Sequence, residues 1–186
     1  MTITQIDAAL DHAERLWADA LSAVAPGDLG RPSGCAGWRI ADLVNHVAGG
    51  GHRYVMLLQG EDAAATASTR SNDYIGTDAL AGFWRYERML RTVAAGADLD
   101  AMVDHRAGPR SGTVLLNMRV MELTLHAKDL CDGLGTRWEP SDDLASYLLE
   151  KVGSTIDELR SKNLFGPATT ARSAAPADRL LALSGR

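Results

Sequence analysis

Cysteine is scarce in this sequence, and Cys35 and Cys131 are the only two among 186 residues. Two cysteines are too few for a disulfide scaffold, and they lack the paired spacing of a zinc knuckle. A chain of this length buries a sizeable core without disulfides or a structural metal. We therefore expect one domain over residues 1–186, stabilised by its apolar core.

Basic runs and long apolar stretches are absent as well. The net charge is −5 and no basic run exceeds two residues, which argues against a nucleic-acid partner because phosphate contacts need a concentrated basic face. No apolar stretch approaches the ~20 residues of a membrane-spanning helix. The N-terminal stretch carries Asp7, Asp11 and Glu14 where a signal peptide needs a basic start and an apolar centre. We expect a cytoplasmic protein that binds neither nucleic acid nor a membrane.

The alternating apolar pattern of β-strands is also missing, and apolar residues instead recur at three- and four-residue steps. This spacing predicts helices over residues 2–24, from 38 or 40 to 60, from 77 or 78 to about 95, from 111 or 113 to 135, and from after Pro140 to beyond Leu159. Residues 60–76 are predicted to be an exposed connection and residues 96–112 to be irregular. The expected fold is all-α: a four-helix bundle on which a C-terminal extension, residues 163–186, packs with one short helix.

Two polar residues stand out within the apolar stretch "MELTLHAKDL". Glu122 and His126 are four residues apart, so their side chains share one face of the predicted helix. One interpretation is an ordinary salt bridge. The other is part of a metal site, because both side chains converge above one helical turn. Spacing alone favours the salt bridge, since Glu-x-x-x-His occurs by chance in many helices.

A third ligand would strengthen the metal interpretation, and His46 is the best candidate. It lies in the helical pattern "ADLVNHVAGGG", and this helix is a natural neighbour of the one that carries Glu122 and His126. A histidine on an apolar stripe is usually a core residue satisfied by one hydrogen bond, and this reading stays open. The glycines that follow, residues 49–51, each cost roughly 0.5–1 kcal/mol relative to alanine in a helix. They indicate either a helix end or kink, or a close approach of the backbone to a ligand or another helix.

These two stretches resemble a known family. "SGCAGWRIADLVNHVAGG" is similar to the entry motif of the mycothiol-dependent maleylpyruvate isomerase family, within the DinB-like metal-binding superfamily, and "RVMELTLHAKDLCDGLG" is similar to its second signature. The closing "DRLLALSGR" resembles the tail of a short, single-domain branch of that family. The resemblance implies a DinB-like four-helix bundle whose metal is held by His46, Glu122 and His126. Two positions depart from the family pattern, with Lys128 where an aromatic residue is common and Ala36 where a proline is frequent.

The implied ligand set also suggests a chemistry. Two imidazoles and one carboxylate form the open three-ligand set of catalytic zinc, and the same set suits nickel, iron, cobalt or manganese. The resemblance implies mycothiol or a similar thiol as cosubstrate, which a metal would deprotonate. The expected activity is isomerisation of a small electrophilic substrate or transfer of the thiol to it, whereas water at the metal would make a hydrolase. Because no protein thiol is then needed, we expect Cys35 to be structural and Cys131 to fill the core.

Other polar side chains are candidates for supporting roles around the metal. Asp129 and Asp42 lie one turn from a predicted histidine ligand and are candidates to bind the outer nitrogen of its ring. The alternative for each is a plain surface carboxylate. Arg53 and Arg119 are candidates for substrate binding, although we expect most arginines here to be solvated and Arg119 to pair with a carboxylate one turn away. Trp38 is expected to pack in the core.

Two other classes of protein remain open at the level of the sequence. One is a metal-binding bundle without catalysis, acting as a stress-responsive or ligand-binding protein. The other is a bare structural bundle in which Glu122 and His126 form only a salt bridge. A homodimer is an open expectation in each case, since bundles with exposed apolar faces often dimerise.

Overall fold

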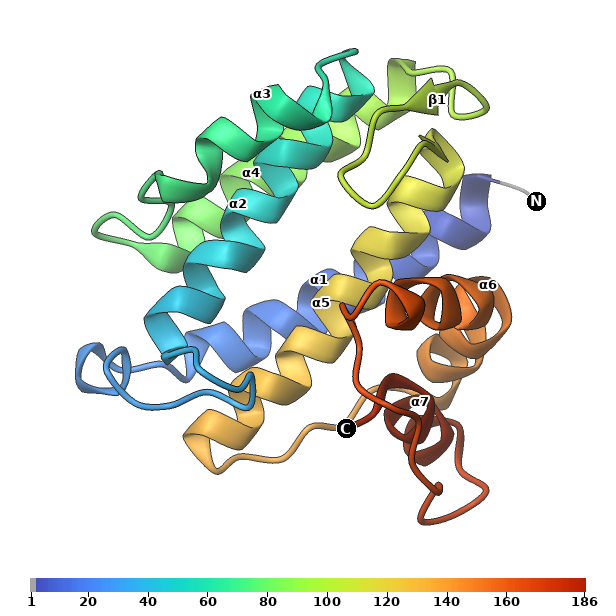
Figure 1. Cartoon of the computed structure of the whole chain (residues 1–186). Coiled ribbons are helices and arrows are strands. Elements are labelled where there is room, and N and C mark those ends of the chain that lie inside the picture. The colour runs from blue at the N-terminus through green and yellow to red at the C-terminus, as the bar shows by residue number, and fades with distance from the viewer. Residues whose placement is uncertain (1–2) are drawn as a thin grey trace.

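The protein is all-α in this computed structural model, which describes residues 3–186 (Figure 1). Its helices are α1 (Ile3–Ser22), α2 (Ile40–Leu58), α3 (Ala63–Ser68), α4 (Ala79–Gly96), α5 (Gly112–Leu134), α6 (Asp142–Ser161) and α7 (Pro176–Ser184). The shorter elements are the 3-10 turns η1 (Pro26–Asp28) and η2 (Thr69–Ser71) and the paired strands β1 (Met102–Val103) and β2 (Arg110–Ser111). The all-α prediction is confirmed, and the strands lie in the segment that was predicted to be irregular. Among the described helices, none combines the length and the hydropathy needed to cross a bilayer.

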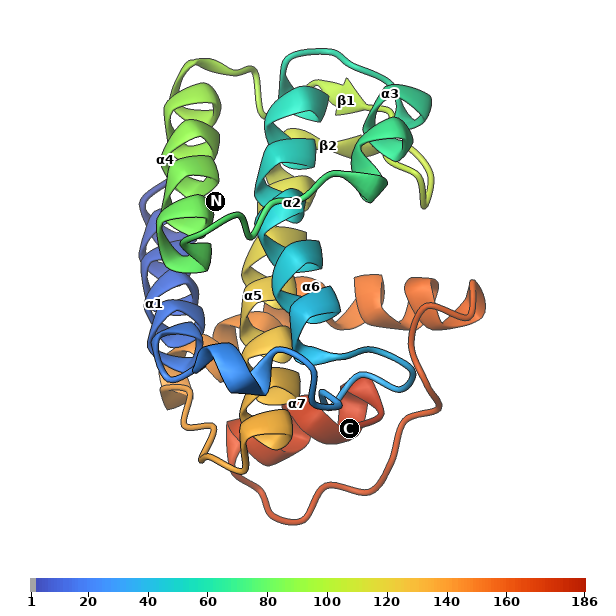
Figure 2. The same ribbon diagram turned by 90° about the vertical axis from the view of Figure 1, so that its left-hand side faces the viewer.

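Helices α1, α2, α4 and α5 form the bundle. Helix α2 packs against α4 and α1 packs against α5, while α2 and α5 also contact each other (Figures 1 and 2). Helix α5 is central, and its residues Leu115, Leu123 and Leu130 have no exposed surface. Because α6 covers a further face of α5, a polar side chain in the middle of α5 needs a partner inside the protein.

Local capping places the helix ends close to the predicted positions. The side chains of Asp78, Ser111 and Ser141 accept hydrogen bonds from backbone N–H groups in the first turns of α4, α5 and α6. These bonds satisfy donors that a helix N-terminus leaves unpaired. Helix α5 ends at Gly135, whose φ of 71° is the left-handed conformation that commonly follows a helix.

The segment over residues 60–76, predicted to be an exposed connection, is instead folded against the bundle. It contains α3 and η2, and Thr66 and Tyr74 are buried. Asn45 of α2 fixes it, because its amide donates to the carbonyl of Asn72 at 3.0 Å and accepts from the N–H of Tyr74 at 2.7 Å. The prediction of an exposed connection holds for most of these residues and fails for Thr66, Thr69 and Tyr74, because contacts with α2, and not the composition of the segment, order this part of it.

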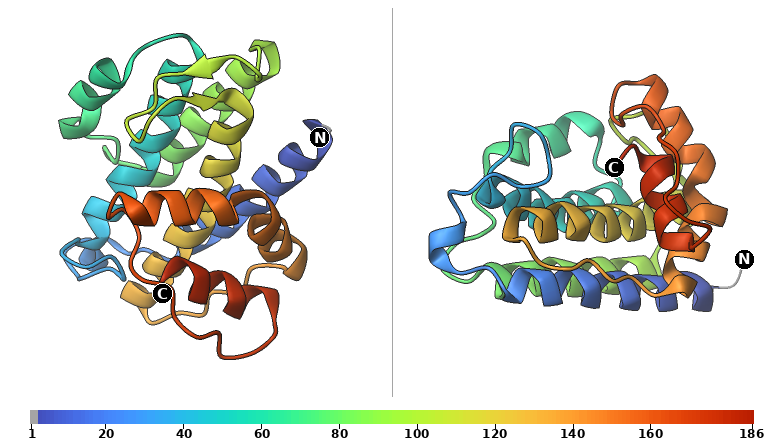
Figure 3. Two further views of the ribbon diagram at one scale, coloured as in Figure 1. Left: turned by 45° about the vertical axis from the view of Figure 1, so that its right-hand side comes forward. Right: turned by 90° about the horizontal axis from the view of Figure 1, so that it is seen from below.

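The C-terminal part of the chain packs to one side of the bundle (Figure 3). Helices α6 and α7 contact each other, and α6 also contacts α5. The connection between them folds back, with Arg160 donating to the carbonyl of Gly166 at 2.9 Å and the N–H of Thr169 donating to the carbonyl of Ala182 at 2.8 Å. This fold-back brings the start and the end of the C-terminal segment to the same side of α5.

Candidate metal centre

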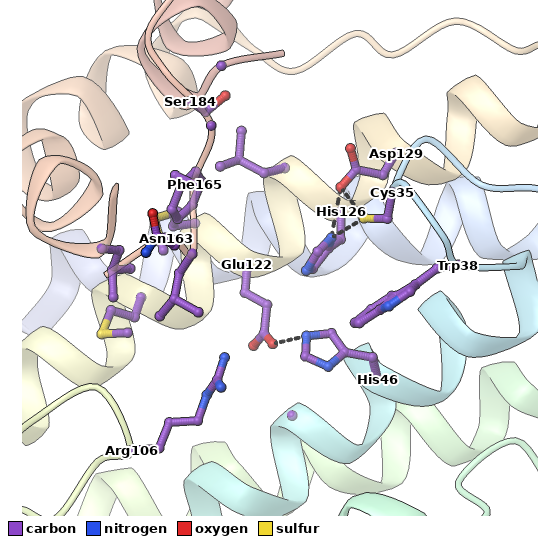
Figure 4. A pocket seen from close by; sticks show the side chains of 18 of the residues that line it. Cys35, Trp38, His46, Arg106, Glu122, His126, Asp129, Asn163, Phe165 and Ser184 are labelled. Carbon is purple, nitrogen blue, oxygen red and sulfur yellow. Dashed lines mark hydrogen bonds and ion pairs between the residues drawn. The ribbon is translucent and has the colours of Figure 1, made fainter. Parts of the chain in front are cut away.

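Three donor side chains converge between α2 and α5. His46 comes from α2, and Glu122 and His126 come from successive turns of α5 (Figure 4). Nε2 of His46 lies 3.1 Å from Oε1 of Glu122, and ligand atoms of all three side chains lie within 4.8 Å of one another. Two imidazoles and one carboxylate at this spacing fit a divalent cation, because catalytic zinc takes this donor set.

Arg119 determines which oxygen of Glu122 faces the site. Its Nη1 donates to Oε2 of Glu122 at 2.7 Å, and its Nη2 donates to Oε1 of Glu87 at 2.5 Å and to the carbonyl of Val47 at 2.9 Å. The other oxygen of Glu122, Oε1, is thereby left to face His46. The expectation that Arg119 is solvated is wrong, because its side chain is fully buried, and the alternative that it binds substrate does not fit this burial either. Two carboxylates and a carbonyl satisfy its charge in the interior, and its pairing with Glu122 is confirmed.

The protonation states of the two groups that face each other suit metal binding. Burial would raise the pKa of Glu122, but the Arg119 guanidinium and the hydrogen bond with His46 outweigh burial and hold this pKa well below its usual range. Glu122 is therefore ionised at neutral pH. Burial lowers the pKa of His46, although its contact with Glu122 works in the opposite direction. A neutral imidazole and an ionised carboxylate are the forms that bind a metal.

The glycines at residues 49–51 make room for this buried network. All three lie in the interior of α2 and are buried, so they do not mark a helix end. A Cβ at Gly50 would lie 2.6 Å from Nη1 of Arg119, and a Cβ at Gly51 would lie 2.6 Å from Oε1 of Glu87. Of the two explanations left open by the sequence, close approach of a neighbouring helix's side chains is the one that the structure supports.

Asp129 contacts His126 on the side of the ring that faces away from Glu122. Its Oδ2 lies 2.9 Å from Nδ1 of His126, which leaves Nε2 of the ring for a cation. Arg186 and Cys35 also donate to this carboxylate. Burial would raise the pKa of Asp129, but the hydrogen bonds from His126 and Arg186 hold it well below its usual range.

Asp42 does not contact His46, and its predicted supporting role is wrong in this structure. Its side chain is 48% exposed, and it accepts a hydrogen bond from the backbone N–H of Arg39 at 2.9 Å. Asp42 is the third residue of α2, and an acidic side chain at this position reaches back to the free N–H group at the helix start. This local interaction takes the carboxylate away from the site.

Cys35 lies beside the site as a protonated thiol. Its Sγ is 3.1 Å from Oδ2 of Asp129 and 3.7 Å from Nδ1 of His126. Burial and the negative charge of Asp129 raise the pKa of Cys35 to about 12, so the thiolate needed for nucleophilic chemistry is not formed at neutral pH. Cys131 is buried in the core, as predicted.

The three donors open onto a cavity of ≈ 940 Å³. One part of its wall is basic and contains Arg53, Arg70 and Arg106, while methionines and leucines of α5 and α6 form an apolar part. Burial lowers the pKa of Arg70, and the charges of Arg106 and Arg53 lower it further. Within residues 3–186, none of these three arginines forms an ion pair with a carboxylate. Such a concentration of positive charge suits a ligand that carries a carboxylate or a phosphate.

Trp38 also lines the cavity, and the expectation that it packs in the core is wrong. Its side chain is 37% exposed, and its ring meets the ring of His46 edge-on with centroids 4.9 Å apart. It stacks towards His126 with centroids 6.4 Å apart (Figure 4). Trp38 lies in the turn before α2, and this turn directs it over the two histidines and away from the core.

Several residues of the cavity wall gave no signal in the sequence. His105 and Arg106 come from the turn between β1 and β2, and Phe165 and Arg186 come from the C-terminal segment. The turn has no apolar period, and the C-terminal segment has one only over its short helix, which does not indicate that Phe165 or Arg186 would approach the site. An ion pair between Arg110, which follows this turn, and Glu158 of α6 holds the turn between β1 and β2 in place.

Comparisons with known proteins place the chain in a family. The sequence model of the mycothiol maleylpyruvate isomerase N-terminal domain matches residues 10–131, a range that includes His46, Glu122 and His126. The uncharacterized protein Rv0738 of Mycobacterium tuberculosis (strain ATCC 25618 / H37Rv) is 26% identical over 180 residues, which cover 94% of each chain. The uncharacterized protein MT0763 of Mycobacterium tuberculosis (strain CDC 1551 / Oshkosh) matches with the same identity and coverage.

Two solved structures share the fold. Crystal structures of the mycothiol-dependent maleylpyruvate isomerase and of a mutant of it align with TM-scores of 0.60 and 0.62. Each covers 81% of this chain and 69% of its own, at 17% sequence identity. The family match spans well over half of the sequence and contains the three converging donors. The chain therefore belongs to the family of the mycothiol maleylpyruvate isomerase N-terminal domain.

Proposed function

We propose that this protein is a divalent-metal-dependent enzyme that uses a low-molecular-weight thiol such as mycothiol on a small anionic electrophile. The reaction is isomerisation of that electrophile or transfer of the thiol to it. The observation that carries the proposal is the convergence of His46, Glu122 and His126 at the wall of a cavity that also has a basic part, formed by Arg53, Arg70 and Arg106. Family membership supports the use of a thiol.

Zinc is the proposed ion, because two imidazoles and a carboxylate leave coordination positions open, as catalytic zinc sites do. When bound, the ion would supply the thiol cosubstrate in its deprotonated form. The chain's own residues prepare the site for it. Arg119 fixes one oxygen of Glu122 and leaves the other free, and Asp129 fixes the ring of His126.

The basic part of the cavity is the proposed site for the electrophile. The guanidinium groups of Arg53, Arg70 and Arg106 bind and orient a carboxylate, because each offers several donors in a fixed plane. The apolar side chains of α5 and α6 exclude water from the space between this carboxylate and the three donors. A thiolate kept dry and close to an activated double bond reacts faster than one in water.

Metal analysis of protein purified without chelator tests the first step. We expect about one divalent ion per chain, and loss of that ion in a Glu122→Gln variant. His12→Ala is the control, because His12 is exposed on α1 and is not one of the converging donors. An absence of metal in the wild-type protein, even after incubation with zinc, would refute the proposal.

The second step is tested with cobalt in place of zinc. We expect mycothiol to change the visible absorption of the cobalt-loaded protein, and we expect mycothiol-dependent isomerisation of maleylpyruvate or thiol transfer to monochlorobimane. An Arg70→Gln variant is expected to raise KM for the anionic substrate and to leave KM for the neutral bimane unchanged. A bound metal whose spectrum does not respond to mycothiol would instead favour a metal-binding protein without thiol chemistry.

A further inference from the structure

Arg186 lies outside the residues that match the family, yet it is connected to the candidate metal centre through one residue, Asp129. Its Nε donates to Oδ1 of Asp129 at 3.0 Å, and its Nη2 donates to Oδ2 at 2.8 Å. Oδ2 in turn lies 2.9 Å from Nδ1 of His126. We infer that Arg186 is a positioning residue, which holds Asp129 and thereby keeps the imidazole of His126 turned with Nε2 towards the cation. The inference rests on the metal site proposed above.

The two hydrogen bonds from Arg186 fix the plane of the carboxylate. A single contact would let the Asp129 side chain rotate, whereas the two N–H groups of the guanidinium engage both oxygens at once. The side chain of Asp129 is only 4% exposed, so protein donors and not bulk water satisfy its carboxylate in this structure. Cys35 donates to the same oxygen that binds His126, at 3.1 Å, and leaves Oδ1 to Arg186 alone.

The fold delivers Arg186 to this position by a defined turn. Helix α7 ends at Gly185, whose φ of 73° redirects the chain towards α5. The N–H of Arg186 donates to the carbonyl of Leu181 at 3.0 Å, and its guanidinium lies 5.7 Å from the centroid of the Phe165 ring. A Cβ at Gly185 would lie 2.8 Å from the carbonyl oxygen of Pro167, so the turn fits closely against the C-terminal segment. The side chain of Arg186 is therefore held between the carboxylate of Asp129 and the ring of Phe165, with 21% of it exposed.

A purely electrostatic effect of Arg186 predicts the opposite outcome from a positioning role. Removal of a positive charge close to a cation site strengthens cation binding by Coulomb's law. Loss of the group that orients a ligand weakens binding, typically 10- to 100-fold for a residue that contacts the ligand. Arg186 acts one contact further away, so we expect a loss of about 10-fold in Arg186→Ala. In Arg186→Lys, which keeps the charge but not the planar pair of donors, we expect most of that loss to remain.

The orientation of His126 is measured in the metal-free protein by nitrogen-15 NMR of the histidine rings at about pH 8, where imidazoles are neutral. The His126 signals are assigned by comparison with a His126→Gln variant. We expect the proton on Nδ1 in the wild-type protein, because this nitrogen donates to Asp129. In Arg186→Ala we expect a mixture of the two tautomers. A wild-type tautomer in Arg186→Ala would overturn the inference.

The affinity for zinc is measured on the same variants by competition with a chelating dye. Arg179→Ala is the matched control, since Arg179 is exposed on α7 and the substitution makes the same change of charge. Unchanged or tighter zinc binding in Arg186→Ala, with thermal stability equal to that of Arg179→Ala, would refute the positioning role. Failure of the wild-type protein to bind zinc would refute the proposed function instead, and the tautomer measurement would still decide the role of Arg186.

Discussion

The substitution Gly50→Ala adds a single methyl group where α2 faces the buried network. The new Cβ would lie 2.6 Å from Nη1 of Arg119 and 3.0 Å from both carboxylate oxygens of Glu122. The side chain of Arg119 has no exposed surface and is tied to Glu87 and to the carbonyl of Val47, so it cannot move aside. Either the two helices separate or the bond between Arg119 and Glu122 is broken. Each response costs about 1–3 kcal/mol.

The higher helix propensity of alanine stabilises the variant, so its contribution is subtracted from the cost of the clash. Alanine is favoured over glycine inside a helix by about 0.5–1 kcal/mol, so we expect Gly50→Ala to lower the free energy of unfolding by about 1 kcal/mol, within a range of about 0–2.5 kcal/mol. Gly153→Ala in α6 is the matched control. Its Cβ meets its nearest neighbour, Leu183, at an ordinary 3.8 Å, so this variant should be more stable than the wild type by about 0.5–1 kcal/mol.

Urea denaturation of the metal-free proteins measures these two changes, and a zinc titration of the folded variants measures the effect on the site. Because the methyl group displaces the carboxylate of Glu122, we expect zinc affinity to fall by about 10- to 100-fold in Gly50→Ala and to stay unchanged in Gly153→Ala. If both variants are stabilised equally and bind zinc equally well, then the glycines are not required for the approach of α5.

Two further predictions concern groups beside the donors. Burial, followed by the charges of Arg106 and Arg110, lowers the pKa of His105 to about 4 from 6.5. The unfolded state therefore binds more protons between these values, and the wild-type protein should lose stability as the pH falls through this window. In urea denaturation over this pH range, His105→Asn should lose less stability than the wild type, and equal losses would contradict burial as the cause. Cys35, with its pKa of about 12 instead of 9, should react with iodoacetamide on the order of 1,000-fold more slowly in the folded metal-free protein than in urea. Mass spectrometry of the alkylated peptide measures this, and equal rates would show that the thiol is exposed and ionisable.

The helices of this fold are predictable from the sequence because their causes are local. The apolar period gives their positions, and side chains such as Asp78 and Ser141 that cap the first turn give their starts. The segment over residues 60–76 was not predictable in this way. It is ordered by the amide of Asn45, a residue of α2 whose contacts nothing in the segment itself indicates.

The donors of the site were predictable only in part. His46, Glu122 and His126 were chosen from spacing and from the resemblance to a family, and the structure brings them together. The incorrect predictions concern side chains that the sequence alone does not assign to the surface or to the interior. Arginine is usually a surface residue, but Arg119 is buried because Glu87 and Glu122 form ion pairs with it in the interior.

The cavity combines parts of the chain that are far apart in sequence. The donors lie on α2 and α5, within the residues that match the family, whereas residues 163–167 and 184–186 form another part of the wall. Part of the cavity wall therefore comes from a segment outside the family match, and that segment also reaches His126 through Arg186 and Asp129. We expect replacements at residues 163–167 to change which molecules fit while the three donors stay in place. A replacement of Arg186 is expected to change both at once, so this one side chain couples the specificity of the cavity to the geometry of the donors.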